Sequence, residues 1–230
     1  MDWEMSLIIG LTVVFVASYA LGSIWNRRIQ KAFWNSLRER LRRYTRRVSY
    51  KSFGSSGFKV AFRPPSGPLR KMEIALILLA REIPPYLLAA YALGRRDRMI
   101  FKANAVARPT LHFEAIGPKT SLKKDVKLKL EALKPVEAGG LSRYITILSD
   151  KPDRASEFLK KGVFEKLMKL RECLERFSIS KTEPHILLVC KRNEEAIGEA
   201  LDLLEKTANL LRELSGAREE ARKGGRGKRR

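Results

Sequence analysis

An uncharged run near the start of the chain sets the strongest limit on what this sequence can fold into. Residues 5–25, MSLIIGLTVVFVASYALGSIW, contain no Asp, Glu, Lys or Arg. At about 1.5 Å per residue, such a helix spans roughly 30 Å, which matches the hydrocarbon core of a bilayer. Trp3 and Trp25 flank the run, as aromatic residues flank membrane-spanning helices. We therefore expect one transmembrane helix.

Two other interpretations of this run fit less well. A cleaved signal peptide carries basic residues before a shorter apolar run, whereas Asp2 and Glu4 precede this one. A buried core helix is rarely apolar on all its faces over so many turns. Small residues within the span would let a second membrane helix approach closely, and we expect that contact at Gly10, Ser18 and Gly22.

The charges beside the span predict its orientation. No basic residue precedes the run, whereas Arg27, Arg28 and Lys31 follow it closely. The positive-inside rule then places the amino terminus outside and the chain from Asn26 onwards in the cytoplasm. The expected location is the cell membrane, or the endoplasmic reticulum membrane in a eukaryote.

The overall charge predicts a polyanionic partner. The chain has 47 Lys plus Arg against 25 Asp plus Glu, a net charge of +22. An excess of this size favours binding to RNA, to anionic lipid headgroups, or to both.

The basic residues concentrate in two segments. The first, 26–51, shows an apolar stripe that predicts an amphipathic helix over about 26–49. Its lipid- or RNA-facing residues are predicted to be Arg27, Arg28, Lys31, Arg38, Arg42, Arg43, Arg46 and Arg47. Alternatively, the stripe packs on the folded domain and the charges only set the topology. The second segment is the carboxyl-terminal tail, whose predicted polyanion-binding residues are Arg218, Arg222, Lys223, Arg226, Lys228, Arg229 and Arg230.

Between these segments the hydrophobic pattern predicts an α+β domain with a mainly antiparallel sheet. Strands are expected at 58–62, 69–79, 98–107, 111–116, 143–149, 178–181 and 185–191, and the third and fourth of these should form a hairpin. Helices are expected at 84–94, 119–134, 154–161 and 163–176, and from about 194 to 215. The resulting organisation is a short extracytoplasmic segment (1–4), the span (5–25), a basic juxtamembrane helix (26–51), the α+β domain (52–192), a helix packed on it (193–216) and a basic tail (217–230).

Few residues suggest catalysis. His112 and His185 lie within strand patterns, and with Cys173 and Cys190 they show no metal-ligand spacing. The two cysteines are expected to be buried free thiols. Phosphate-binding loops and nucleophile elbows are absent from the sequence. We expect a non-enzymatic protein without catalytic residues, metal or cofactor; an enzyme would need a polar pocket beside one of the histidines.

The order of elements resembles the calumin family, coiled-coil-domain-containing subunits of the translocon-associated PAT complex. The similar stretches lie between about residues 30 and 223: QKAFWNSLRERL, MEIALILL, LHFEAIG, RYITILSD and EEAIGEALDLLEKTANLL. The compact, Lys-, Arg- and Glu-rich composition looks like an archaeal form.

The resemblance implies a ribosome-binding membrane protein that assists the insertion and folding of multi-pass membrane proteins. Its implied partners are ribosomal RNA, to which the basic tail residues named above would bind, the Sec translocon channel, a small Asterix-like membrane protein and nascent membrane-protein clients. The alternative is a membrane-tethered module that binds anionic lipid or RNA.

Overall fold

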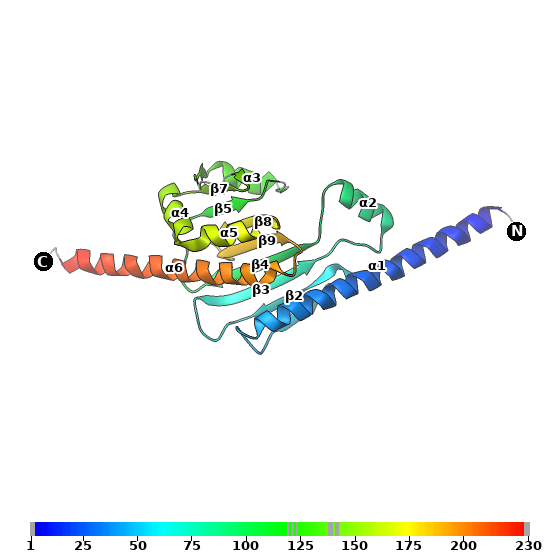
Figure 1. The fold of residues 1–230 in the computed structure, drawn as a ribbon, viewed down its shortest axis with the longest axis horizontal. Coiled ribbons are helices and arrows are strands. Elements are labelled where there is room, and N and C mark those ends of the chain that lie inside the picture. Colours follow the sequence, from blue (N-terminus) through cyan, green and yellow to red (C-terminus); the bar gives the residue numbers. More distant parts are fainter. Residues whose placement is uncertain are drawn as a thin grey trace.

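The chain forms an α+β structure in which a long apolar amino-terminal helix joins an open antiparallel sheet (Figure 1). The computed structural model describes residues 3–118, 120, 122, 124–137, 140 and 143–227, with backbone alone from 216. The helices are α1 (Trp3–Leu41), α2 (Pro84–Ala92), α3 (Lys124–Glu131), α4 (Pro152–Phe158), α5 (Phe164–Leu170) and α6 (Ala196–Gly227), with a π turn at Leu159–Val163. The strands are β1 (Ser49–Ser52), β2 (Gly57–Phe62), β3 (Leu69–Ile77), β4 (Arg98–Ala105), β5 (Phe113–Ile116), β6 (Lys134–Pro135), β7 (Thr146–Ser149), β8 (Leu174–Ile179) and β9 (Ile186–Lys191).

The strands of the described chain form one sheet in the order β1-β2-β3-β4-β9-β8-β5-β7-β6, and each neighbouring pair is antiparallel. This confirms the predicted α+β class with a mainly antiparallel sheet. The predicted hairpin between 98–107 and 111–116 is wrong, because β4 pairs with β3 and β9 while β5 pairs with β8 and β7. Two strands from late in the sequence separate them. Alternation in sequence shows that a strand has a buried face but does not name its neighbours.

The second half of α1, together with α5 and α6, packs on one face of the sheet (Figure 1). From α1 the buried apolar residues are Ile29, Phe33, Leu37 and Leu41, four residues apart, so they form one stripe. Phe33 meets Phe58 of β2 edge to face, with ring centroids 5.9 Å apart. The predicted stripe of α6 is confirmed, since Ile197, Leu201, Leu204, Ala208 and Leu211 are all buried.

The span and the basic helix were predicted as separate segments, but α1 is one continuous helix from Trp3 to Leu41. It is also shorter than predicted at its far end, since residues 49–52 form β1 and pair with β2. Tyr44, which was expected in the helical stripe, instead packs against Phe62 and donates a hydrogen bond of 2.8 Å to Glu205. Pairing of the strand edge thus displaces the last two turns of the predicted helix.

Further boundaries differ from the prediction. The helix expected over 163–176 ends at Leu170, because 174–179 form a strand between β5 and β9. Gly162 breaks the helical hairpin as expected, with a φ of +91°. The helix expected over 119–134 is α3, with Lys119 and Lys123 outside the described residues. The backbone of α6 continues to Gly227, within the predicted tail.

Phe33 provides a test of the packing of α1 on the sheet. Its side chain is fully buried, so Phe33→Ala should lower the free energy of unfolding by about 3–5 kcal/mol. Chemical unfolding of the full chain in detergent would measure this. Phe53→Ala is the matched control, because Phe53 is 38% exposed, and a similar loss in both variants would contradict the packing.

Candidate polyanion-binding surface

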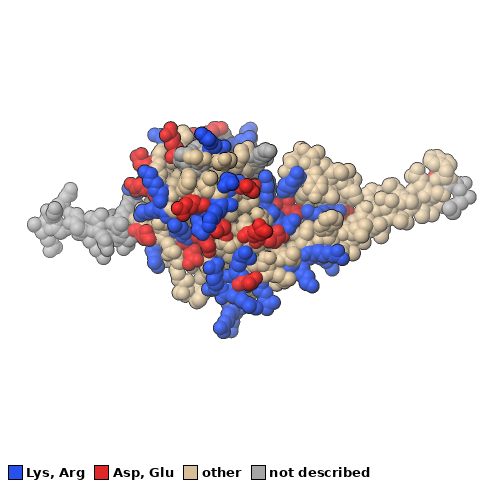
Figure 2. Space-filling view, viewed as in Figure 1, with Lys and Arg blue, Asp and Glu red and all other residues tan. Residues whose placement is uncertain are grey.

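The predicted basic residues of α1 and the turn after it all lie at the surface. The eight are Arg27, Arg28, Lys31, Arg38, Arg42, Arg43, Arg46 and Arg47, and each is exposed. Figure 2 shows Lys and Arg gathered over the end of α1 and again beside its uncharged segment. The apolar stripe of the same helix faces the sheet. The structure therefore confirms that the stripe packs on the domain, while the ligand of the surface charges stays a prediction.

These residues form two groups at different distances from the uncharged segment. The proximal group, Arg27, Arg28 and Lys31, follows Trp25 within two turns. The distal group is Arg38, Arg42, Arg43, Arg46 and Arg47. At about 1.5 Å per residue, Arg38 lies roughly 20 Å along the helix from Trp25, and Leu41 roughly 24 Å.

The turn that carries most of the distal group is tied to the domain. Tyr44 bonds Glu205 of α6, and Arg43 forms an ion pair of 3.5 Å with Asp202. Burial, followed by the bond to Glu205, raises the pKa of the Tyr44 phenol, so it remains a donor at neutral pH. The distal arginines are thus held at the far end of α1.

The predicted tail residues are placed only in part. Arg218, Arg222, Lys223 and Arg226 lie on the backbone helix α6, and Lys228, Arg229 and Arg230 lie outside the described residues. The end of α6 points away from the amino-terminal end of α1 (Figure 1).

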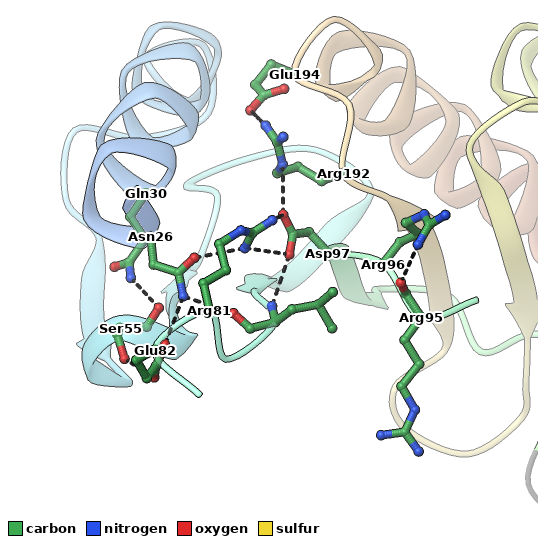
Figure 3. Close-up of polar contacts among 11 residues, drawn as sticks. Asn26, Gln30, Ser55, Arg81, Glu82, Arg95, Arg96, Asp97, Arg192 and Glu194 are labelled. Carbon is green, nitrogen blue, oxygen red and sulfur yellow. Dashed lines mark hydrogen bonds and ion pairs between the residues drawn. The ribbon is translucent and has the colours of Figure 1, made fainter. Parts of the chain in front are cut away.

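A buried polar junction, which the sequence analysis did not predict, joins α1 to the sheet (Figure 3). Asn26 is fully buried and donates to the Leu79 carbonyl at 2.9 Å, while its own oxygen accepts from Arg81 at 2.8 Å. Arg81 also forms an ion pair of 2.8 Å with Asp97.

Asp97 is the acceptor on which this polar junction converges. Besides Arg81, it accepts bonds from the Leu79 amide at 3.0 Å and from Arg192 at 3.3 Å. Burial acts to lower the pKa of Arg81, but the bond to Asp97 and the charge of that carboxylate outweigh burial and raise the pKa, so the guanidinium stays charged. The sequence feature that could have indicated this junction is the uncharged stretch 83–94, which charged residues flank on both sides.

Gly22 was predicted to contact a partner helix, but it is buried within its own chain. A Cβ there would lie 2.4 Å from the Arg81 carbonyl, so only glycine allows the connection between β3 and α2 to cross α1 this closely. Gly10 has open space around it and Ser18 is half-buried, so both remain candidates for that contact. Gly22 serves an intramolecular contact because the domain begins to pack before the uncharged run has ended.

A second polar cluster lies under the opposite half of the sheet. Glu114 is 1% exposed and accepts two bonds from Arg176, at 2.8 and 2.9 Å, and one from Ser178 at 2.7 Å. His112 lies 3.2 Å from the same carboxylate. Burial acts to raise the pKa of Glu114, but the bonds from Arg176, His112 and Ser178 outweigh it and lower the pKa below its ordinary value. A carboxylate saturated by donors in this way acts as a structural anion.

The residues considered for catalysis are accounted for structurally. His185 is buried, with Nδ1 3.2 Å from the Ala105 carbonyl. Neither histidine lines the broad hollow of about 720 Å³ beside α6, which Lys161, Lys166, Asp202 and Glu213 help to form. Cys173 and Cys190 are free and buried, as predicted. Within the described residues, His, Cys, Asp and Glu form no metal-binding group.

Comparisons with known proteins give little guidance. Neither a known protein family nor a curated protein sequence matches the chain. Three chains of solved structures match it. One is the mycobacterial trehalose monomycolate transport factor A, TtfA, with 10% sequence identity and a TM-score of 0.48 over 81% of this chain and 96% of that chain. A likeness at this level says nothing about what this chain binds.

Asp97 tests the polar junction. Asp97→Asn removes the anion that Arg81 and Arg192 share and should cost about 3–5 kcal/mol of unfolding free energy, because Arg81, whose side chain is only 12% exposed, then lacks its counter-charge. Chemical unfolding of the full chain measures the cost. The control is Asp125→Asn on the exposed face of α3, expected to change stability by less than about 0.5 kcal/mol. Equal effects would argue against the junction.

Glu114 predicts a pH dependence. Because its folded pKa is lowered from 4.5, its ionised form stabilises the fold above that pH, and this contribution is lost as pH falls through the folded pKa. Glu114→Gln should therefore narrow the difference in unfolding midpoint between neutral and acidic pH. Glu172→Gln, at an 86% exposed side chain, should leave the difference unchanged. A wild-type pH profile in the Glu114 variant would contradict this role.

Proposed function

We propose that this protein is a single-pass membrane protein without enzymatic activity that binds ribosomal RNA near a translocon and assists membrane-protein insertion. One observation carries the proposal. The helix that contains the candidate membrane span continues without a break into the domain and ends beside exposed arginines. The apolar part of α1 is almost wholly exposed, which suits contact with lipid.

The distance between the two basic groups favours different ligands for each. Electrostatic attraction between exposed charges decays over about 8 Å at physiological ionic strength. With the span at residues 5–25, the proximal group lies within this range of the headgroups. The distal group lies roughly 20 Å or more beyond Trp25, and a usual tilt of about 20° changes this little. The distal group therefore suits a polyanion that stands away from the membrane.

Ribosomal RNA is a polyanion of this kind. Arginine binds phosphate oxygens through a planar fork of donors, and such contacts position a protein without reading base sequence. The resemblance to the calumin family supports ribosomal RNA over other RNA. It also suggests the remaining partners: the Sec channel, a small Asterix-like protein and nascent clients, which would meet the exposed apolar half of α1. We also propose, as part of the same function, that the protein has no enzymatic activity.

The second candidate is a membrane-tethered module that binds anionic lipid or non-ribosomal RNA. It is favoured by the proximal group, Arg27, Arg28 and Lys31, which suits headgroups at about 1 kcal/mol per charge. In its lipid form, this candidate assigns no ligand to the distal group.

Matched charge reversals separate the candidates. The full chain in nanodiscs of zwitterionic lipid is sedimented with purified ribosomes across a salt series. Arg42, Arg46 and Arg47 changed to Glu should weaken binding and reduce the salt slope by roughly 2–3, since three phosphate contacts are lost. Arg43 is left intact because it pairs with Asp202.

The control carries the same three-charge reversal at Arg27, Arg28 and Lys31 and should retain most of the binding. Equal loss in both variants would show that net charge, not the distal surface, drives binding. Binding to ribosomes no stronger than to free unrelated RNA would instead support the second candidate.

A further inference from the structure

The helix α2 is apolar, yet most of its side chains are exposed instead of packed in the core of the domain. Of its nine residues, Pro84–Ala92, Ala90 is the buried one. Large apolar side chains around it are exposed: Ile83 (51%), Tyr86 (40%), Leu88 (71%), Tyr91 (43%) and Leu93 (71%). No charged residue occurs from 83 to 94. Leaving such a surface in water is unfavourable, so it calls for a partner.

The attachment of α2 places it at the inner end of the candidate span. The backbone of Arg81 and Glu82, just before α2, lies directly on Gly22. Glu82 accepts from Ser55 at 2.6 Å, and Arg81 is held by Asn26 and Asp97 (Figure 3). Gly22 is three residues before Trp25, about 5 Å inside the end of the uncharged run. Figure 1 shows α2 beside α1, where the exposed half of that helix leaves the domain.

We infer that α2 inserts into the membrane leaflet nearest the folded domain and forms a second lipid contact beside the span; this rests on the proposed membrane anchor. Helices of this type bury about 5–10 Å into the boundary between headgroups and acyl chains. Figure 2 shows α2 as an uncharged projection next to the uncharged part of α1.

The residues around α2 favour lipid over a protein partner. The exposed apolar side chains lie around the helix and its two ends, whereas docking on a protein groove uses one stripe. Tyr86 and Tyr91 are of the type that concentrates at membrane interfaces. Arg95 and Arg96 follow directly, at the base of the projection, and the Arg96 guanidinium lies 5.2 Å from the Tyr91 ring centroid. With Arg27 and Arg28 on α1, they provide cations for anionic headgroups.

The consequence is a fixed orientation of the domain. A single span leaves the attached domain free to rotate about the membrane normal and to lean. A second insertion point, tied to α1 through Gly22 and Asn26, removes the leaning motion. The basic surface at the end of α1 would then face away from the membrane.

Depth-dependent quenching in the full chain tests this inference. An environment-sensitive fluorophore is attached to Leu88→Cys in nanodiscs of phosphatidylcholine and phosphatidylglycerol, with and without lipids that carry a quenching spin label. We expect a blue-shifted emission and a clear loss of fluorescence at residue 88, and the same label at Val16→Cys, near the middle of the span, is the positive control for contact with lipid. Leu128→Cys on α3, 56% exposed, should show neither change. Unmodified chain gives the background, since Cys173 and Cys190 are buried.

The outcomes separate this inference from the proposed function. Quenching at 16 and an aqueous signal at 88 would overturn the inference and keep the anchor. No quenching at 16 would overturn the anchor itself. A label at 88 shielded from aqueous iodide but not quenched by lipid would show protein cover and overturn the lipid assignment. Leu93→Cys, at an equally exposed residue, repeats the test and should match Leu88→Cys.

Discussion

The continuity of α1 through two environments is the constraint on which the rest of the structure depends. One half of the helix exposes apolar side chains on all faces, and the other buries a stripe in the core of the sheet domain. A helix of this kind transmits position, because its backbone bonds run unbroken from Trp3 to Leu41. The position of the first half of α1 therefore also sets the position of the arginines at the far end of the helix.

The polar junction makes that transmission possible. Asn26 lies one turn after Gly22, where α1 begins to pack on the domain, and its amide group bonds to Leu79 and Arg81. Asp97 then connects Arg81 to Arg192 near the start of α6. Two apolar surfaces could slide past each other here, whereas a network of directional bonds defines one register.

The same junction organises the surface of the protein. The connection that crosses Gly22 carries α2 out beside α1, with Arg27 and Arg28 following Gly22 on α1 and Arg95 and Arg96 following α2. The distal arginines lie at the other end of the domain, fastened through Tyr44 to α6. Apolar, proximal basic and distal basic surfaces therefore follow one another along a single axis. This arrangement is what the proposed role between a membrane and a polyanion requires.

The sequence by itself determined the features that depend on local composition. The uncharged run of 21 residues, the exposed arginines of α1 and the buried stripe of α6 all follow from short-range periodicity and charge. The α+β class with an antiparallel sheet could be inferred in the same way, because alternating segments predict half-buried strands. Tertiary structure decided which strands are neighbours. β4 and β5, close in sequence, are separated by β8 and β9, since pairing depends on complementary faces that distant segments supply. Tertiary structure also decided how Gly22, Asn26 and residues 83–94 pack together, although the sequence places them in separate elements. Their contacts join segments more than fifty residues apart, and a local sequence pattern cannot predict which distant segments meet.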